Sequence, residues 1–75
     1  MLRALIDRKG EPFAYLQGQT LYTLAGEATG RLKDGFIVDM AGNRRWRVVG
    51  DGVYNLNGSE TVGFFGEPIA DDYWR

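Results

Sequence analysis

The chain has 75 residues and a formal net charge of −1, and it contains neither cysteine nor histidine. At this length we expect one domain that hides about 60–65% of the surface of the unfolded chain, without disulfides, thiolate metal sites or histidine ligands for zinc. The small net charge gives the molecule no overall basic field, so binding to nucleic acid would require a local patch.

The first residues carry scattered apolar side chains between charges, in the order Leu2-Arg3-Ala4-Leu5-Ile6-Asp7. An export signal has a continuous apolar region instead, and no stretch of the chain approaches the roughly 18 apolar residues of a membrane span. We therefore expect a cytoplasmic protein with no membrane partner.

From there on, glycine recurs at a constant step of 16 residues. The copies are Leu5-Ile6-Asp7-Arg8-Lys9-Gly10, Leu21-Tyr22-Thr23-Leu24-Ala25-Gly26, Ile37-Val38-Asp39-Met40-Ala41-Gly42 and Val53-Tyr54-Asn55-Leu56-Asn57-Gly58. The Asp, Thr or Asn side chain accepts a hydrogen bond from the backbone two residues on, and glycine enters the positive-φ region without a Cβ clash. The pattern predicts four hairpin loops, each a type I turn followed by a left-handed glycine.

After each turn glycine the chain alternates, which is typical of a half-buried strand. The residues expected on one face are Ala14, Leu16, Gly30, Leu32, Trp46 and Val48. The opposite face would carry Thr29, Arg31 and Lys33 in the second copy and Arg45 and Arg47 in the third. The fourth copy has one additional residue before its apolar pair, which we interpret as a bulge in the strand.

Turn residues interrupt the chain too often for an amphipathic helix of about ten residues. The sequence therefore predicts an all-β domain over residues 1–75, built from four tandem β-hairpin repeats of about 16 residues arranged with pseudo-fourfold symmetry. The approximate limits of the repeats are 4–19, 20–35, 36–51 and 52–67. An SH3-like or PRC-type small barrel is the alternative fold, because glycine-punctuated strands that end in Trp-Arg-Val also occur there.

Residues 68–75 lie outside the repeat and form a C-terminal tail. Ile69, Tyr73 or Trp74 would cover an open end of the sheet assembly, as terminal caps do in repeat proteins. The tail would alternatively serve as a peptide that binds a partner.

Two segments, Gly10-Glu11-Pro12-Phe13-Ala14-Tyr15-Leu16 and Asn57-Gly58 to Val62-Gly63-Phe64-Phe65, resemble a small bacterial family, the 4-fold beta flower proteins. Units of that family read Ile-Tyr-Asp-x-x-Gly-x-Pro-Val-Ala-Tyr-Leu, and the resemblance covers most of the chain. Copies two and three depart from it, since Thr29-Gly30-Arg31-Leu32 and Arg45-Trp46-Arg47-Val48 place arginine where the family tends to have an aromatic residue. The resemblance implies a fourfold arrangement of hairpins and no established activity.

A cationic strand face is the first candidate binding site. Arg31, Lys33, Arg45 and Arg47 would share it if copies two and three are neighbours, and arginine offers paired donors to a phosphate or carboxylate. Tyr15, beside Phe13, would supply a stacking platform for a base or a sugar. The competing interpretation is a solvated exterior whose charges prevent edge-to-edge pairing of sheets.

Aromatic side chains suggest a second role, assembly. The residues that we expect to mediate it are Tyr22, Tyr54, Phe64, Phe65 and Trp74. They predict a non-enzymatic binding or assembly module that forms a homo-oligomer, with a different protein partner as an alternative and nucleic acid only through the local patch.

Catalytic and metal chemistry find little support. Asp7, Thr23, Asp39 and Asn55 recur three residues before a glycine, where turn formation explains them, and the chain lacks the closely spaced oxygen donors of a calcium loop. We expect no metal and no cofactor. A hydrolase built on two carboxylates that folding brings together is a distant third hypothesis.

Overall fold

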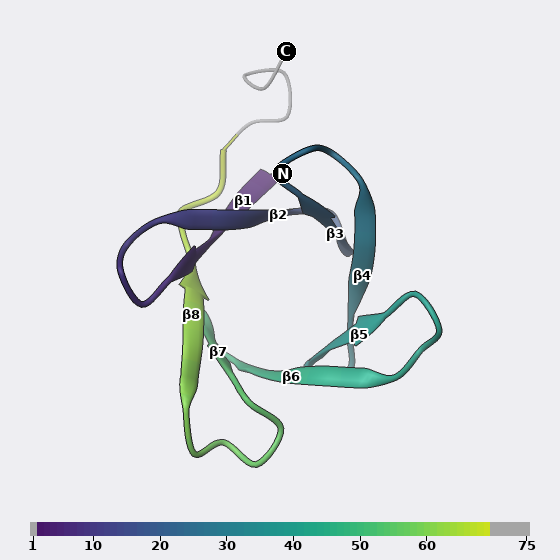
Figure 1. Ribbon diagram of the computed structural model, residues 1–75, viewed down its shortest axis with the longest axis vertical. Coiled ribbons are helices and arrows are strands. Elements are labelled where there is room, and N and C mark those ends of the chain that lie inside the picture. Colours follow the sequence, from purple (N-terminus) through teal and green to yellow (C-terminus); the bar gives the residue numbers. More distant parts are fainter. Residues whose placement is uncertain (1, 70–75) are drawn as a thin grey trace.

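The computed structural model describes residues 2–69, and within them the chain forms eight β-strands and no helix. The strands are β1 (Leu2–Asp7), β2 (Pro12–Gln17), β3 (Thr20–Thr23), β4 (Ala28–Lys33), β5 (Phe36–Asp39), β6 (Arg44–Val49), β7 (Gly52–Tyr54) and β8 (Thr61–Phe65). Figure 1 shows four hairpins whose loops project outward one after another around a common centre. The prediction of an all-β chain of tandem hairpins is confirmed.

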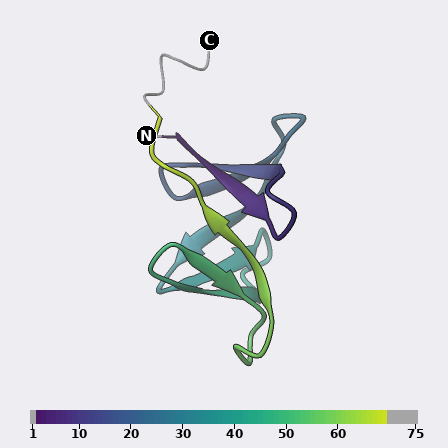
Figure 2. The ribbon, with the colours of Figure 1, turned by 90° about the vertical axis from the view of Figure 1, so that its left-hand side faces the viewer.

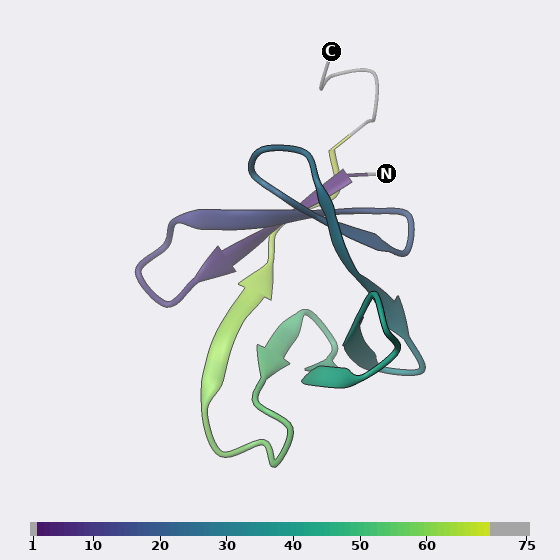
Figure 3. The ribbon, with the colours of Figure 1, turned by 45° about the vertical axis from the view of Figure 1, so that its right-hand side comes forward.

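The strands close into an antiparallel barrel in which each strand pairs with its neighbours in the sequence. Strands β1 and β8 complete the ring through the pairs Leu5 with Phe65 and Ile6 with Phe64, and they lie side by side in Figures 2 and 3. Leu2 and Ile69 extend this seam with two backbone hydrogen bonds of 2.8 and 2.7 Å. A closed barrel has no free sheet edge, so its backbone donors and acceptors are satisfied within the chain.

The turn within each hairpin follows the chemistry of its residues. In the β1–β2 turn, the Gly10 N–H donates to the carbonyl of Asp7, and the Asp7 carboxylate accepts from the backbone N–H groups of Lys9 and Glu11. The φ angles of the four repeated glycines, Gly10, Gly26, Gly42 and Gly58, are 85°, 88°, 90° and 77°. Glycine is needed there because other residues are strained at such angles.

The turns between hairpins are of the primed types. Asp34 and Gly35 both have positive φ, as in a type I′ turn, whereas only the first central residue does at Gly18 and at Gly50, as in type II′. The twist of primed turns matches the right-handed twist of the strands that they join, which favours two-residue hairpin connections.

One β-bulge recurs in all four hairpins, just before the outward-projecting loop. The pairing between the two strands shifts register by one residue after Leu5, Leu21, Ile37 and Val53. The unpaired residues are Phe13, Thr29, Arg45 and Val62.

The additional residue of the fourth copy is therefore not the cause of a bulge in that strand alone. It lies in the loop, because the Asn55 N–H donates to the carbonyl of Glu60, five residues on, whereas Asp39 pairs with Asn43, four residues on. An exposed loop accommodates an insertion at little cost, which is why the barrel register continues unchanged beyond it.

The barrel core is built from equivalent positions of the hairpins. Leu5, Leu21, Ile37 and Val53, which are 16 residues apart, are all buried. Leu16 and Phe65 of the second strands are buried with them, and Leu32 and Val48 pack against the cluster. Burying each such side chain stabilises the fold by about 1.5–3 kcal/mol, so this repeated apolar interior is what holds the hairpins together.

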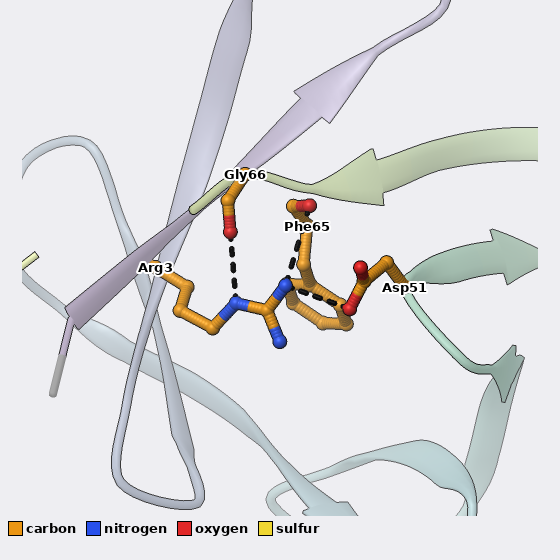
Figure 4. Close-up of polar contacts among 4 residues, drawn as sticks. All are labelled: Arg3, Asp51, Phe65 and Gly66. Atoms are coloured by element: carbon orange, nitrogen blue, oxygen red, sulfur yellow. Dashed lines mark hydrogen bonds and ion pairs between the residues drawn. The ribbon is translucent and has the colours of Figure 1, made fainter. Parts of the chain in front are cut away.

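Arg3 closes the barrel seam at the end where β8 finishes (Figure 4). Its Nε donates to the carbonyl of Gly66 at 2.8 Å, and a terminal nitrogen donates to the Asp51 carboxylate at 2.7 Å. The guanidinium also lies 5.4 Å from the centre of the Phe65 ring. One side chain thus joins β1, the β6–β7 turn and the end of β8.

Candidate functional site

Cross-strand pairing gathers positive charge on the outer face of β4, β5 and β6. Arg31 of β4 and Arg44 of β6 both pair with Val38 of β5. One step along the strands, Lys33 and Arg47 pair with Phe36. Since paired residues point to the same side of a sheet, these side chains form one surface, the basic face: Arg31, Lys33, Arg44 and Arg47 around Phe36 and Val38.

The side chains of the basic face contact one another. The Arg44 guanidinium lies 4.2 Å and that of Arg47 5.8 Å from the centre of the Phe36 ring. Val38 is on the outward side of β5 between Arg31 and Arg44, yet it is only 6% exposed. Phe36 and Val38 thus form an apolar floor that holds two arginines in place.

The predicted composition of this face was partly wrong. Arg31, Lys33 and Arg47 lie on it, but Arg45 is the bulged residue of its hairpin and Arg44 takes its place opposite Val38. Simple alternation assigns Arg45 and Arg47 to one side, and a bulge between them reverses that assignment. Neither Arg44 nor Phe36 was assigned to this face from the sequence, because the position of the bulge has no clear local signature.

The basic face is open to a ligand. Its four cations are exposed, and within residues 2–69 none of them has a carboxylate at ion-pair distance. The alternative role, protection of a sheet edge, does not apply, because β4, β5 and β6 each have a partner strand on both sides. The arginines of β4 and β6 thus keep their paired donors accessible to an anion.

The two tyrosines predicted as a stacking platform and as an assembly contact pair with each other, Tyr15 on β2 and Tyr22 on β3. They line a small pocket of about 190 Å³ together with Leu2 and Gln17. Strand β3 separates Tyr15 from the cations of β4, so the structure does not bring Tyr15 into the basic face.

An apolar strip crosses the outer surface next to the basic face, with which it shares strand β6. The pairs Val49 with Gly52, Gly52 with Phe64, and Phe64 with Ile6 form one row over β6, β7, β8 and β1. The Tyr54 side chain packs onto Gly52, since a Cβ at Gly52 would lie 2.6 Å from the Tyr54 hydroxyl oxygen. Val49 is 61% and Phe64 47% exposed, and we call Ile6, Val49, Tyr54 and Phe64 the apolar strip.

One of the residues expected to mediate assembly lies in the core instead. Phe65 is 4% exposed and belongs to the barrel core, so it offers no surface to a partner. Its neighbour Phe64 points outward because successive strand residues face opposite sides. Trp74 lies outside the described residues.

A cavity of about 460 Å³ opens at the end of the barrel where the bulges lie. Leu21, Ile37 and Trp46 line it on the core side, and Leu56 reaches it from the turn of the fourth hairpin. Its lining also includes Thr29 and Arg45, two of the four bulged residues, and Val38 and Arg44 of the basic face.

The other two bulged residues are apolar and cover the core. Phe13 and Val62 pack against the core cluster, and Phe13 meets Trp46 edge to face with ring centres 6.1 Å apart. Phe13 was expected on the outward face beside Tyr15, and the bulge is again the reason that it turns inward.

Asp39 lines the same cavity, but its carboxylate is occupied by its own turn. It accepts from the backbone N–H groups of Asn43 and Ala41 at 2.9 Å and from the Asn43 side chain at 3.3 Å. The Asn43 backbone hydrogen bond is the main cause that holds the pKa of Asp39 below its ordinary value of 3.8, and the positive charge of Arg45 lowers it further. Asp39 thus remains an anion that is satisfied by the turn.

Residues 2–69 contain no group of three or more acidic residues placed to hold a metal ion. The described part of the chain also includes no helix that is long and apolar enough to span a membrane. Comparisons with protein-family models, curated proteins and solved structures found no match to this chain.

Proposed function

We propose that the protein is a non-enzymatic binding module whose basic face holds a polyanion, and that single-stranded nucleic acid is the ligand. One observation carries the proposal: strand register collects Arg31, Lys33, Arg44 and Arg47 on one face without a carboxylate partner within the described chain. Equivalent outward positions in the first and fourth hairpins carry no charge, among them Tyr15, Gln17 and Phe64.

The spacing of the cations suits an extended chain of phosphates. Strands β4 and β6 lie on either side of β5, so their cations form two rows about 10 Å apart. Between the rows lies the floor of Phe36 and Val38, and Tyr54 continues it beside Arg47. Bases stack on aromatic rings and on arginine planes, while cations track the phosphates.

Salt dependence of binding tests the proposal. We would measure fluorescence anisotropy of a labelled oligothymidylate with the full chain between 50 and 200 mM salt. Four neutralised phosphates give a slope of about −3 for log K against log salt concentration, which is roughly a 50-fold loss of affinity over that range. Heparin serves as the comparison for polyanions that lack bases.

The matched variants change the charge equally at two places. Arg31→Glu with Arg47→Glu should abolish binding, whereas Arg8→Glu with Lys9→Glu, in the exposed β1–β2 turn, should leave most of it. Equal loss in both pairs, or no binding by the wild type, contradicts the proposal. Binding to heparin but not to the oligonucleotide would retain the basic face and exclude nucleic acid.

A second candidate function, self-association, is supported by the apolar strip. Because the barrel is closed, copies would pack face to face through Phe64, Val49 and Tyr54 rather than by strand pairing. Phe64→Ser should convert the oligomer to a monomer in sedimentation analysis, whereas Leu24→Ser, at a loop residue that is 57% exposed, should not. A wild type that is monomeric at high micromolar concentration would exclude this function.

We also propose that the hairpins are related by a pseudo-fourfold axis, which the shared turns and bulges support, and that the protein works in the cytoplasm. The first matches the resemblance to the 4-fold beta flower family, which stays a prediction from the sequence, and the second rests on the scattered apolar residues at Leu2 to Asp7.

A further inference from the structure

We propose that the cavity at the bulged end of the barrel is a second binding site, which adjoins the basic face at Val38 and Arg44, for a small carboxylate or phosphate that carries a flat apolar body. Nothing in this inference depends on the polyanion bound by the basic face. It rests on the shape and lining of the cavity and on how the second and third hairpins differ from the first and fourth.

The cavity exists because of two substitutions within the repeat. At the bulge position, Phe13 and Val62 cover the core, while Thr29 and Arg45 are exposed and leave it open. A barrel that needed only stability would bury an apolar residue at all four positions, since each buried side chain adds about 1.5–3 kcal/mol. Thr29 and Arg45 therefore lower the stability of the barrel at the place where the cavity opens.

The lining indicates the ligand. A volume of about 460 Å³ lies within the range of small-molecule sites and well above the roughly 150 Å³ that holds one benzene ring. Leu21, Ile37 and Leu56 offer apolar contacts, and Trp46 offers an aromatic surface. A molecule with one or two fused rings matches this interior.

Two cations line the cavity, Arg44 and Arg45. The Arg44 guanidinium lies over the Phe36 ring, so Arg45 supplies the charge that selects an anion. The Asp39 carboxylate, which also lines the cavity, is already occupied by hydrogen bonds from its own turn. Arg45 therefore has a guanidinium available for a ligand carboxylate, with the Thr29 hydroxyl on the neighbouring hairpin as a further donor. The negative charge of Asp39 would repel a second anionic group, so we infer that the ligand carries a single anionic group.

Three probes test the site: 1-naphthoate, 1-naphthalenemethanol and 1-naphthylmethylammonium. They share the same ring system and differ in the charge of the group attached to it. Each is titrated into the full chain and followed by the amide and indole signals of Trp46, Leu56 and Ile37 in NMR spectra. A hydrogen bond to a charged group corresponds to a factor of about ten or more in affinity. We therefore expect naphthoate to bind at least about tenfold more tightly than the alcohol, and the ammonium compound to bind most weakly.

Variants separate this site from the basic face. Arg45→Gln should reduce the affinity for naphthoate to that for the alcohol, whereas Arg31→Gln, with the same change of charge, should have little effect. Arg45→Val, which copies Val62 of the fourth hairpin, should close the cavity to all three probes. Equal affinity for the three probes, equal effects of Arg45→Gln and Arg31→Gln, or signal changes confined to β4 and Phe36 would overturn the inference while leaving the proposed polyanion site standing.

Discussion

Replacing Arg3 should destabilise the barrel far more than replacing Asp51, its partner in the ion pair. The Arg3 side chain is 26% exposed and that of Asp51 is 70% exposed. An exposed ion pair contributes about 0.2–1 kcal/mol. The hydrogen bond from the charged guanidinium to the Gly66 carbonyl, 2.8 Å long and partly buried, is worth about 1.5–3 kcal/mol. The contact with the Phe65 ring adds about 0.5–1 kcal/mol.

Arg3→Met should therefore lower the free energy of unfolding by about 2–4 kcal/mol, and Asp51→Asn by less than about 1 kcal/mol. A chain of this size has a total of roughly 4–11 kcal/mol, so the first variant loses a large share of its stability. The midpoint of thermal unfolding should fall by roughly 10–30 °C in Arg3→Met and by a few degrees in Asp51→Asn.

Urea unfolding followed by circular dichroism measures both variants. Adding about 0.5 M salt should remove the effect of Asp51→Asn, because exposed charges are screened, and should leave most of the effect of Arg3→Met. Similar losses in the two variants would show that the ion pair dominates and that the reasoning from burial is wrong.

Three further predictions concern the barrel seam, the turns and the core. Gly63→Ala should cost about 3 kcal/mol or more, because its Cβ would overlap the backbone carbonyl oxygen of Ile6 and push β1 away from β8. Gly66→Ala, whose methyl group would meet the end of the Ile6 side chain at 3.1 Å, should cost much less in the same urea assay. Because the pKa of Asp39 is lowered in the folded protein, its contribution to stability is complete above its unfolded-state pKa and is lost as pH falls through the lower folded value. Asp39→Asn should therefore weaken the pH dependence of the free energy of unfolding below about pH 4. A titration midpoint of the Asp39 carboxylate above 3.8 in NMR spectra of the folded protein would contradict this. Val53→Ala, at a fully buried position, should cost about 1.5–4 kcal/mol, and a thermal midpoint equal to that of the wild type would show that this position does not support the core.

The turns could be predicted from the sequence because their chemistry is local. Asp7 and Gly10 specify a type I turn with a left-handed glycine wherever they occur at this spacing, since the hydrogen bonds involved lie within five residues. The number of hairpins therefore followed from short-range rules.

The faces of the second strands could not be predicted in the same way. A bulge changes the direction of the bulged residue, and its position depends on how two strands meet across the barrel rather than on either strand alone. Phe13 turned from an expected outward platform into part of the core, and Arg45 was replaced by Arg44 on the basic face. Strict alternation back from Arg47 assigns Arg45 to the basic face, whereas the bulge puts Arg44 there instead. A single bulge is therefore enough to change the composition of a binding surface.

Equivalent positions show where the repeat has diverged. The outward position of Tyr15 in the first hairpin and Phe64 in the fourth is occupied by Arg31 and Arg47 in the second and third, and at the bulge Thr29 and Arg45 replace apolar residues. Turns and buried core residues, which all four hairpins need in order to close the barrel, have kept their chemical character. Polar substitutions at both positions coincide in the same two adjacent hairpins, and the two anionic ligands that we propose would give these substitutions a common cause.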